Sequence, residues 1–464
     1  MLQGIRKIHF IGVGGAGMSA LARILLDKGY EVSGSDRKMS AVAEQLAARG
    51  AKIFEGHDAA NVKGMDAVVV STAIPEDNVE VVAAKAQGLR RLHRSDVNAA
   101  LLNAAKGIAV AGAHGKTTTT SMIGLILEHG GVDPTIIIGG QVDYLADGNA
   151  RLGRGEYLVS EADESDGSFL KLLPRIAVVT NVENDHMDHY GTMENIKKAF
   201  RQFLENTDEK TGTCVLCADN ENLREISKGL SRRVVLYGTA EDAEYRAVNI
   251  APDGAGVAFD VERGGKQLVR VRLNIPGHHN VLNALGSVVT GILCGVSPEK
   301  AAEALALFHG AKRRFETKGR ASGVWIVDDY AHHPTEIEAT LKAARQTKPK
   351  RLICAFQPHR YSRTQLLQKE FGGAFADADL LILTDIYSAG EAPIAGVSGE
   401  TILSAVEKTT GQPVKYIAAR TDIADYLATA VRDGDLVITM GAGDICRTGE
   451  ELLERLRGRA EEKE

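Results

Sequence analysis

Apolar and polar positions along the first hundred residues follow two periods. Short apolar runs with the length of strands lie at 7–14, 30–36, 51–56, 66–74 and 88–93. The stretch AGMSALARILLDKG, residues 16–29, has helical spacing and ends at Gly29, a residue type that terminates helices. Strands alternating with helices predict a parallel, doubly wound α/β sheet.

The same alternation restarts twice further along the chain. Strand, glycine turn and helix follow each other at 106–131, whereas 244–275 alternates polar and apolar residues around glycine turns, which predicts antiparallel hairpins. A third cycle opens at 323–346. The pattern therefore predicts an α/β protein of three domains.

The predicted domains are an N-terminal Rossmann-like domain at 1–106, a central P-loop-type domain at 107–312 and a C-terminal Rossmann-like domain at 313–464. The central domain should combine a parallel sheet with a small antiparallel sheet.

Composition narrows the class of protein. With 464 residues, 44% hydrophobic and 25% charged, the chain has the balance of a globular protein. No apolar run approaches the roughly 18 residues of a spanning helix, and the N-terminus lacks a secretory pattern, so we expect a cytoplasmic protein without membrane contact. A net charge of -6 with both signs interspersed argues against a nucleic-acid partner. We expect a monomer or a weak homodimer.

The first glycine-rich turn, IGVGGAGMS, lies at 11–19. Gly12, Gly14 and Gly17 give G-x-G-x-x-G between strand and helix, and Asp36 follows at the end of the next strand. This pattern is typical of NAD sites, but its physical content is the approach of backbone amides to a pyrophosphate. A dinucleotide, another nucleotide diphosphate and a structural turn all remain open.

The second turn, AGAHGKTTTT at 111–120, is a shortened relative of the P-loop. Gly115 and Lys116 stand at a strand-to-helix junction with Thr117 next, so amides, ammonium and hydroxyl could hold phosphates and a cation. The alternative is a glycine turn before a threonine-capped helix. A lysine at a helix N-terminus opposes the helix dipole, which favours an anionic ligand.

Two later apolar runs end in hard-cation ligands. YLVSEADESD carries Glu161, Asp163, Glu164 and Asp166, and VVTNVENDHMDHY carries Glu183, Asp185, His186, Asp188 and His189. Because ligands bind at the carboxyl ends of parallel strands, these groups should converge on the second turn if the strands are neighbours. Carboxylates combined with phosphates suit Mg²⁺.

The motif series as a whole resembles the Mur ligases. The matching segments, in order, are AGAHGKTTTT, SEADESD, TNVENDHMDHY, PGHHNVLNALGSV, GAKRRFE, VDDYAHHPTE and QPHRYSRT, preceded by IGVGGAGMS and VVVSTAIPEDN. The resemblance covers essentially the whole chain. One departure is Ala113, where many relatives have threonine.

The resemblance implies an ATP-dependent, amide-forming ligase of peptidoglycan precursor synthesis, which joins L-alanine to UDP-N-acetylmuramate with Mg²⁺ or Mn²⁺. The first turn would then bind UDP rather than NAD. The implied catalytic residues are Lys116, Glu161 and His186, and the implied metal ligands are Thr117, Glu161 and His186.

Further roles carried over by the resemblance fall into three groups. The implied ATP-binding residues are Gly112, Ala113, His114, Gly115, Lys116, Thr117, Thr118, Asn280, Asn283, Arg314 and Asp329. The implied UDP-sugar-binding residues are Gly14, Gly15, Asp36 and Ser71. The implied amino-acid-binding residues are Tyr330, His332, His359, Arg360 and Arg363.

Three other functions remain as alternatives. A ligase of the same family that recycles a tripeptide onto the same sugar differs only in the amine substrate. An NAD-dependent dehydrogenase is supported by the first turn alone. A nucleotide-binding sensor would bind both nucleotides without releasing phosphate.

Overall fold

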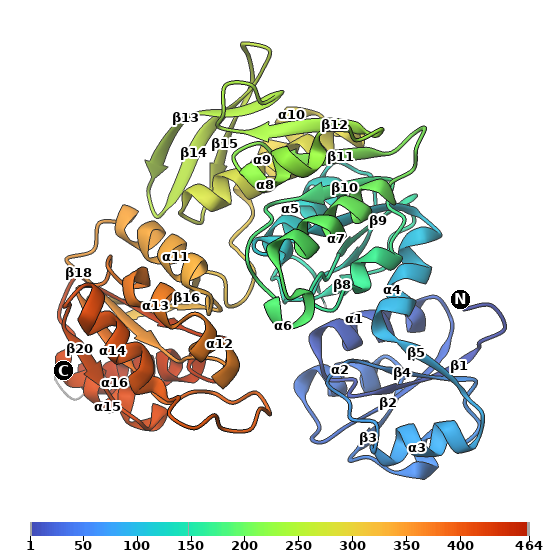
Figure 1. Ribbon diagram of the computed structural model, residues 1–464, viewed down its shortest axis with the longest axis horizontal. Coiled ribbons are helices and arrows are strands. Elements are labelled where there is room, and N and C mark those ends of the chain that lie inside the picture. The colour runs from blue at the N-terminus through green and yellow to red at the C-terminus, as the bar shows by residue number, and fades with distance from the viewer. Residues whose placement is uncertain (1, 147, 462–464) are drawn as a thin grey trace. The chain divides into compact units, whose positions relative to one another are not determined.

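The computed structural model describes residues 2–146 and 148–461 (Figure 1). Across these residues the strands form three sheets. The chain divides into two compact units. The first contains the chain up to Ile250 with Phe259–Arg272 and Val281–Phe308, and the second contains Ala251–Ala258, Leu273–Asn280 and His309 onward. The predicted α/β class is confirmed.

The first sheet is parallel and has the strand order β3-β2-β1-β4-β5. Its strands are β1 Lys7–Ile11, β2 Glu31–Asp36, β3 Lys52–Glu55, β4 Ala67–Val70 and β5 Arg90–His93. Its helices are α1 Ala16–Asp27, α2 Ala41–Ala48, the 3-10 helix η1 Ala59–Val62, α3 Val79–Ala86 and α4 Arg94–Asn103. The order reverses between β1 and β4, which opens a ligand crevice at their carboxyl ends in sheets of this kind.

The central sheet has the order β15-β14-β13-β12-β11-β10-β6-β9-β7-β8. Its strands are β6 Lys106–Ala111, β7 Thr135–Ile137, β8 Ala150–Arg151, β9 Tyr157–Glu161, β10 Ile176–Val179, β11 Thr213–Cys217, β12 Arg233–Gly238, β13 Tyr245–Asp253, β14 Gly256–Arg263 and β15 Lys266–Leu273. Its helices are α5 Lys116–His129, η2 Ser168–Lys171, α6 Met187–Tyr190, α7 Met193–Glu205, α8 Glu221–Ser227, α9 His278–Leu293 and α10 Pro298–Ala306.

The predicted hairpins are present as β13, β14 and β15, and they continue the central sheet. β13 pairs in parallel with β12, with Tyr245 opposite Tyr237. In the middle of the sheet β6 lies between β9 and β10, so the carboxyl ends of these three strands face the turn that precedes α5. The acidic segments that follow β9 and β10 are thus brought to the second glycine turn, as the sequence predicted.

The third sheet has the order β16-β17-β21-β18-β19-β20, with β16 antiparallel to β17 and the remaining pairs parallel. Its strands are β16 Glu316–Ala321, β17 Val324–Asp329, β18 Arg351–Phe356, β19 Leu380–Leu383, β20 Val414–Tyr416 and β21 Asp435–Met440. Its helices are α11 Pro334–Gln346, α12 Tyr361–Leu366, α13 Gln368–Ala374, α14 Gly399–Thr409, η3 Arg420–Asp422, α15 Ile423–Ala430 and α16 Cys446–Glu461.

Successive residues of β17 show that this sheet is covered on both faces. Trp325 and Val327 belong to one buried apolar cluster, whereas Val324 and Ile326 belong to another. Alternate side chains of a strand point to opposite faces, so both faces of the sheet are packed against helices.

A buried polar network joins the first two sheets within the first unit. Arg23 of α1 is fully buried and donates to Asn149 Oδ1 at 2.5 Å. The amide of Asn149 donates to Ala16 O at 2.9 Å and to Ser19 Oγ at 3.0 Å. Within 2–146 and 148–461, no helix combines the length and apolarity that crossing a membrane would require.

Candidate active site

The turn between β6 and α5 is shaped by two glycines that no other residue could replace without strain. Gly112 has φ +137° and Gly115 has φ +85°. A Cβ on Gly112 would lie 2.1 Å from Thr180 Oγ1, and one on Gly115 would lie 2.6 Å from Asn283 Oδ1. Gly115 caps α5 without a side-chain hydrogen bond, so the first amides of the helix remain available to an anion.

Lys116 begins α5, and its ammonium folds back over the turn. Its Nζ donates to Gly112 O at 2.6 Å, Ala113 O at 3.2 Å and Glu164 Oε1 at 2.7 Å. Burial alone would lower the pKa of Lys116, but the neighbouring carboxylates, with Glu164 first among them, raise it above its ordinary value. The lysine is therefore a fixed positive charge at the mouth of the turn.

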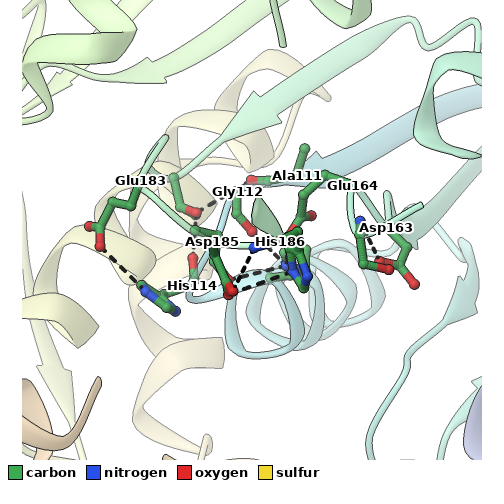
Figure 2. Close-up of polar contacts among 12 residues, drawn as sticks. Ala111, Gly112, His114, Asp163, Glu164, Glu183, Asp185 and His186 are labelled. Carbon is green, nitrogen blue, oxygen red and sulfur yellow. Dashed lines mark hydrogen bonds and ion pairs between the residues drawn. The ribbon is translucent and has the colours of Figure 1, made fainter. Parts of the chain in front are cut away.

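The acidic segment after β9 and the histidine after β10 meet beside this lysine. Glu164, Asp185 and His186 are labelled in Figure 2. His186 Nε2 lies 3.4 Å from Glu164 Oε1 and 3.6 Å from Asp185 Oδ2. Burial lowers the pKa of His186, whereas these carboxylates raise it, and the net direction is upward. Glu161 ends β9, and its Oε1 accepts from Gly139 N at 2.7 Å.

Residues that follow β10 fix the path of the turn. The side chain of Asn181 accepts from His114 N at 2.9 Å and donates to His114 O at 3.0 Å. Thr180 Oγ1 donates to the same carbonyl at 2.6 Å. The imidazole of His114 pairs with Glu183 at 3.4 Å. Because its backbone bonds are already made, the turn is preorganised for a ligand.

Four more of the residues implied at the ATP site lie on two helices. Thr117 and Thr118 are in the first turn of α5. Asn283 of α9 packs against Gly115, while Asn280, one turn earlier, donates to Pro276 O at 2.7 Å.

The donor set around the turn fits a metal ion only together with a phosphate ligand. Among the residues described, no three carboxylate, imidazole or thiol groups are arranged to hold a metal on their own. Mg²⁺ ordinarily combines one or two carboxylates with phosphate oxygens and water. The glycine cradle, the free helix amides and Lys116 supply the phosphate side of such a site.

The first glycine turn lies at the carboxyl ends of β1 and β2. Gly12 has φ +80°, and Gly14 N donates to Asp36 Oδ2 at 2.8 Å. A Cβ on Gly14 would lie 2.8 Å from that oxygen. Gly15 caps α1, and Ser71 follows β4 on the other side of the strand-order reversal. These four UDP-sugar candidates, Gly14, Gly15, Asp36 and Ser71, therefore all come from one edge of the sheet.

In the second unit, rings from two strand ends gather at the carboxyl edge of the third sheet. The His332 ring centroid lies 5.4 Å from that of Tyr330 and 5.8 Å from that of His359. Arg363 Nη1 lies 3.3 Å from His359 Nδ1. Burial lowers the pKa of His332 to about 4 and that of His359 to about 3, so both imidazoles are neutral near pH 7.

Asp329 and Arg314 lie next to this ring cluster. Asp329 accepts from Phe315 N and Ala331 N, each at 2.7 Å, and burial raises its pKa to about 6 despite Arg314. Arg314 lies over the Tyr330 ring and 3.5 Å from Glu336. Arg360, in contrast, is turned toward Glu391 at 4.0 Å.

Comparison with known proteins identifies the family. Residues 7–106 match the Mur ligase family catalytic domain, 110–291 the Mur ligase middle domain and 313–443 the Mur ligase glutamate ligase domain. A UDP-N-acetylmuramate–L-alanine ligase of Pelotomaculum thermopropionicum is 51% identical over 97% of this chain and 98% of its own. The chain belongs to the Mur ligase family.

Other Mur ligases are similar to this chain in sequence and in fold. The UDP-N-acetylmuramate–L-alanine ligase of Desulforamulus reducens is also 51% identical, over 97% of this chain and 98% of its own. The crystal structure of UDP-N-acetylmuramate–alanine ligase from Thermotoga maritima has a TM-score of 0.83 at 29% identity, with 98% and 99% of the two chains covered. A murein peptide ligase from Psychrobacter arcticus has a TM-score of 0.71 at 27% identity, with coverages of 97% and 98%.

Sequence reasoning left parts of this Mur ligase site without a role. Glu164 was one of four acids in its segment, and only the structure separates it from Asp163, which pairs instead with Arg94 of α4. Thr180 and Asn181 were missed, although their position directly after a buried strand was a usable signal. Tyr387, whose ring stacks on His359 at 5.7 Å, had no sequence signal because 28 residues separate the two.

Proposed function

We propose that the protein catalyses ATP-dependent ligation of L-alanine to the carboxylate of UDP-N-acetylmuramate, giving UDP-N-acetylmuramoyl-L-alanine, ADP and phosphate. The observation that carries this proposal is 51% identity, over 97% of the chain, to relatives named UDP-N-acetylmuramate–L-alanine ligase. The glycine turn with Lys116 supports the ATP part of the reaction. The first turn alone suggested an NAD-dependent dehydrogenase, and membership of the Mur ligase family gives that alternative no support.

Each predicted domain would bind one substrate. Residues 1–106 would bind the UDP-sugar, 107–312 would bind ATP and 313–464 would bind the amino acid. We place the reaction in the cytoplasm, where ATP is available, and expect no nucleic-acid partner.

The reaction follows from the chemistry of a carboxylate. An amine cannot expel oxide from a carboxylate, so the carboxylate oxygen first attacks the γ-phosphorus of ATP and ADP leaves, which yields an acyl phosphate. The amine of L-alanine then attacks the acyl carbon, loses a proton, and the tetrahedral species expels phosphate. Lys116 would offset negative charge on the transferred phosphoryl group, a contribution that is mostly electrostatic.

Magnesium or manganese would be held jointly by nucleotide phosphates, Thr117, Glu161 and His186, and would neutralise charge on the phosphoryl oxygens. Gly112 to Thr118 would wrap the phosphates, with Asn280 and Asn283 near the adenine. Arg314 and Asp329 would contact the nucleotide from the second unit. Any such contact requires that bound substrates set the arrangement of the two units.

The other two substrates would meet polar groups at sheet edges. The amides of Gly14 and Gly15 would bind the pyrophosphate of UDP, with Asp36 and Ser71 close by. Tyr330, His332, His359, Arg360 and Arg363 would form the amino-acid site, in which an arginine can bind the carboxylate of L-alanine in bidentate fashion.

Phosphate release from ATP tests the proposal. With UDP-N-acetylmuramate and Mg²⁺ present, L-alanine should stimulate release strongly, and the sugar nucleotide should gain one alanine by mass. Glycine, L-serine and the murein tripeptide serve as parallel amine substrates. Faster release with the tripeptide would assign the protein to recycling, and release with no amine dependence would overturn the ligase proposal.

A further inference from the structure

Glu164 stands out among the carboxylates near the phosphate turn because it bonds the catalytic lysine directly. Only 3% of its side chain is exposed, and its Oε1 accepts from Lys116 Nζ at 2.7 Å. The other two acceptors of that ammonium are the carbonyls of Gly112 and Ala113. An ammonium has three donors, so this arrangement uses all of them without a phosphate.

The second oxygen of Glu164 is in a different situation. Oε1 also faces His186 Nε2 at 3.4 Å, whereas Oε2 is buried and has no hydrogen-bond partner among the residues described. The backbone carbonyl of Glu164 is anchored by the Tyr190 hydroxyl at 2.5 Å, so the residue is held in place. A buried, half-bonded carboxylate beside a phosphate turn is costly, which indicates a role in ligand binding.

We propose that Glu164 is a positioning residue that makes nucleotide binding at this turn conditional on the divalent cation. This inference rests on the proposed ATP site. Without the cation, Glu164 retains Lys116 and its negative charge repels the triphosphate in a largely buried environment, where such repulsion is strong. With the cation, the repulsion is offset and Lys116 can be shared between Glu164 and a phosphate oxygen.

Calorimetry tests the inference. ATP binding is measured without sugar nucleotide, once in EDTA and once in excess MgCl₂. In Glu164→Gln the amide keeps the shape but removes the charge. The affinity of this variant for ATP in EDTA should be about tenfold higher than that of wild type. The ratio of its ATP affinity in MgCl₂ to that in EDTA should be at least tenfold lower than the wild-type ratio. A purely structural role would instead weaken binding equally in both conditions. A direct metal-ligand role would leave metal-free affinity unchanged and reduce only the Mg²⁺ effect; either of these results overturns the inference.

Asp163→Asn is the matched control. Asp163 belongs to the same segment and carries the same charge, but its carboxylate pairs with Arg94 rather than Lys116. The ratio of its ATP affinity in MgCl₂ to that in EDTA should stay within twofold of the wild-type ratio. A change as large as that of Glu164→Gln would show an effect of general negative charge and would contradict the assignment to Glu164.

A second variant keeps the test valid should Glu164→Gln fold poorly. In Lys116→Gln the charge of Glu164 lacks its counterion, so metal-free ATP affinity should fall several-fold more than affinity in Mg²⁺. Equal losses in the two conditions would contradict the inference. Absence of ATP binding to wild type in Mg²⁺ would instead count against the proposed ATP site, so the two failures are distinguishable.

Discussion

The two glycine turns occupy equivalent places in their sheets but differ in the group that meets a carboxylate. Each follows a buried strand and precedes a helix whose cap is a glycine without a side-chain bond. In the first turn the amide of Gly14 is bonded to a carboxylate, Asp36, and no lysine is present. In the second turn Lys116 is bonded to a carboxylate, Glu164.

Each turn also has a buried glutamate near it, and the two glutamates differ in how completely their carboxylate oxygens are hydrogen-bonded. Behind the first turn, Glu80 is fully buried; it accepts from Ser35 at 2.5 Å and Asn61 at 2.7 Å, and it contacts His57 at 2.8 Å. Glu164 has one bonded oxygen and one without a partner. A carboxylate with complete bonding stabilises the fold, whereas one with incomplete bonding can exchange partners when a ligand arrives.

The largest expected effect is at the charged turn. Lys116→Ala should fold normally and lose at least about a thousandfold in kcat, or ~4 kcal/mol of transition-state stabilisation, because the ammonium that shares the phosphoryl charge with the divalent cation is removed. Phosphate release under saturating substrates measures the loss, with thermal unfolding as the check on folding. A folded variant within tenfold of wild type would mean that the second turn is no more dependent on charge than the first.

The next effect concerns Glu80, and it appears in stability. Burial alone would raise the pKa of Glu80, but its interactions with His9, Ser35, Asn61 and His57 outweigh burial and lower the pKa to about 2, from 4.5. A folded-state pKa below the unfolded value stabilises the protein above about pH 4.5, and the contribution is lost as pH falls toward 2. Its size is about 3 kcal/mol.

Glu80→Gln should therefore lower the free energy of unfolding at pH 7 by about 3 kcal/mol. Denaturant unfolding at several pH values between 3 and 7 measures this, and the difference from wild type should shrink toward the acid end. A difference that stays constant with pH would show that Glu80 is not ionised in the folded protein.

Strand length and apolar pattern explain which parts of the fold could be predicted from the sequence. Strands such as β6 and β10 were predicted because their runs, Lys106–Ala111 and Ile176–Val179, are apolar and bounded by turns. The two-residue edge strand β8 carries too little pattern to be found. Its partner β7 has three residues and is only one residue longer.

The site was predicted to the level of segments but not of contacts. Sequence order placed the acids at strand ends, and the parallel sheet brought them together. The choice of Glu164 over Asp163 as the partner of Lys116 depends on which side chain faces α5, 48 residues away in sequence. The same holds for Glu80 and Ser35, 45 residues apart. Such pairs are fixed by tertiary packing, which short-range pattern does not encode.

A smaller effect is expected when a larger side chain replaces Gly14 in the first turn. In Gly14→Val the new Cβ would meet Asp36 Oδ2 at 2.8 Å and Ser40 Oγ at 3.0 Å, which pushes the turn and its amides away from a pyrophosphate. Affinity for UDP-N-acetylmuramate should fall about 30-fold, or ~2 kcal/mol, while ATP affinity stays within twofold. Calorimetry with each nucleotide alone separates the two. NAD should not compete for the site, and competition by NAD would reopen the dinucleotide interpretation.

The smallest effect is expected at Ala113, and it marks where the two turns differ in packing. In the first turn Val13 is fully buried, and its Cβ lies 2.7 Å from where a Cβ on Gly34 would be, so its side chain is part of the core. Ala113 is partly exposed and contributes through its backbone, with its carbonyl accepting from Lys116 at 3.2 Å. Threonine keeps that carbonyl, so Ala113→Thr should change kcat/KM by less than about threefold, which corresponds to under ~0.7 kcal/mol.

A parallel Val13→Ala variant should lose about 1 to 2 kcal/mol of stability through the cavity it leaves. Steady-state kinetics and denaturant unfolding on both variants decide the matter: a tenfold loss of activity in Ala113→Thr would mean that the side chain, rather than the backbone, meets the nucleotide at the second turn.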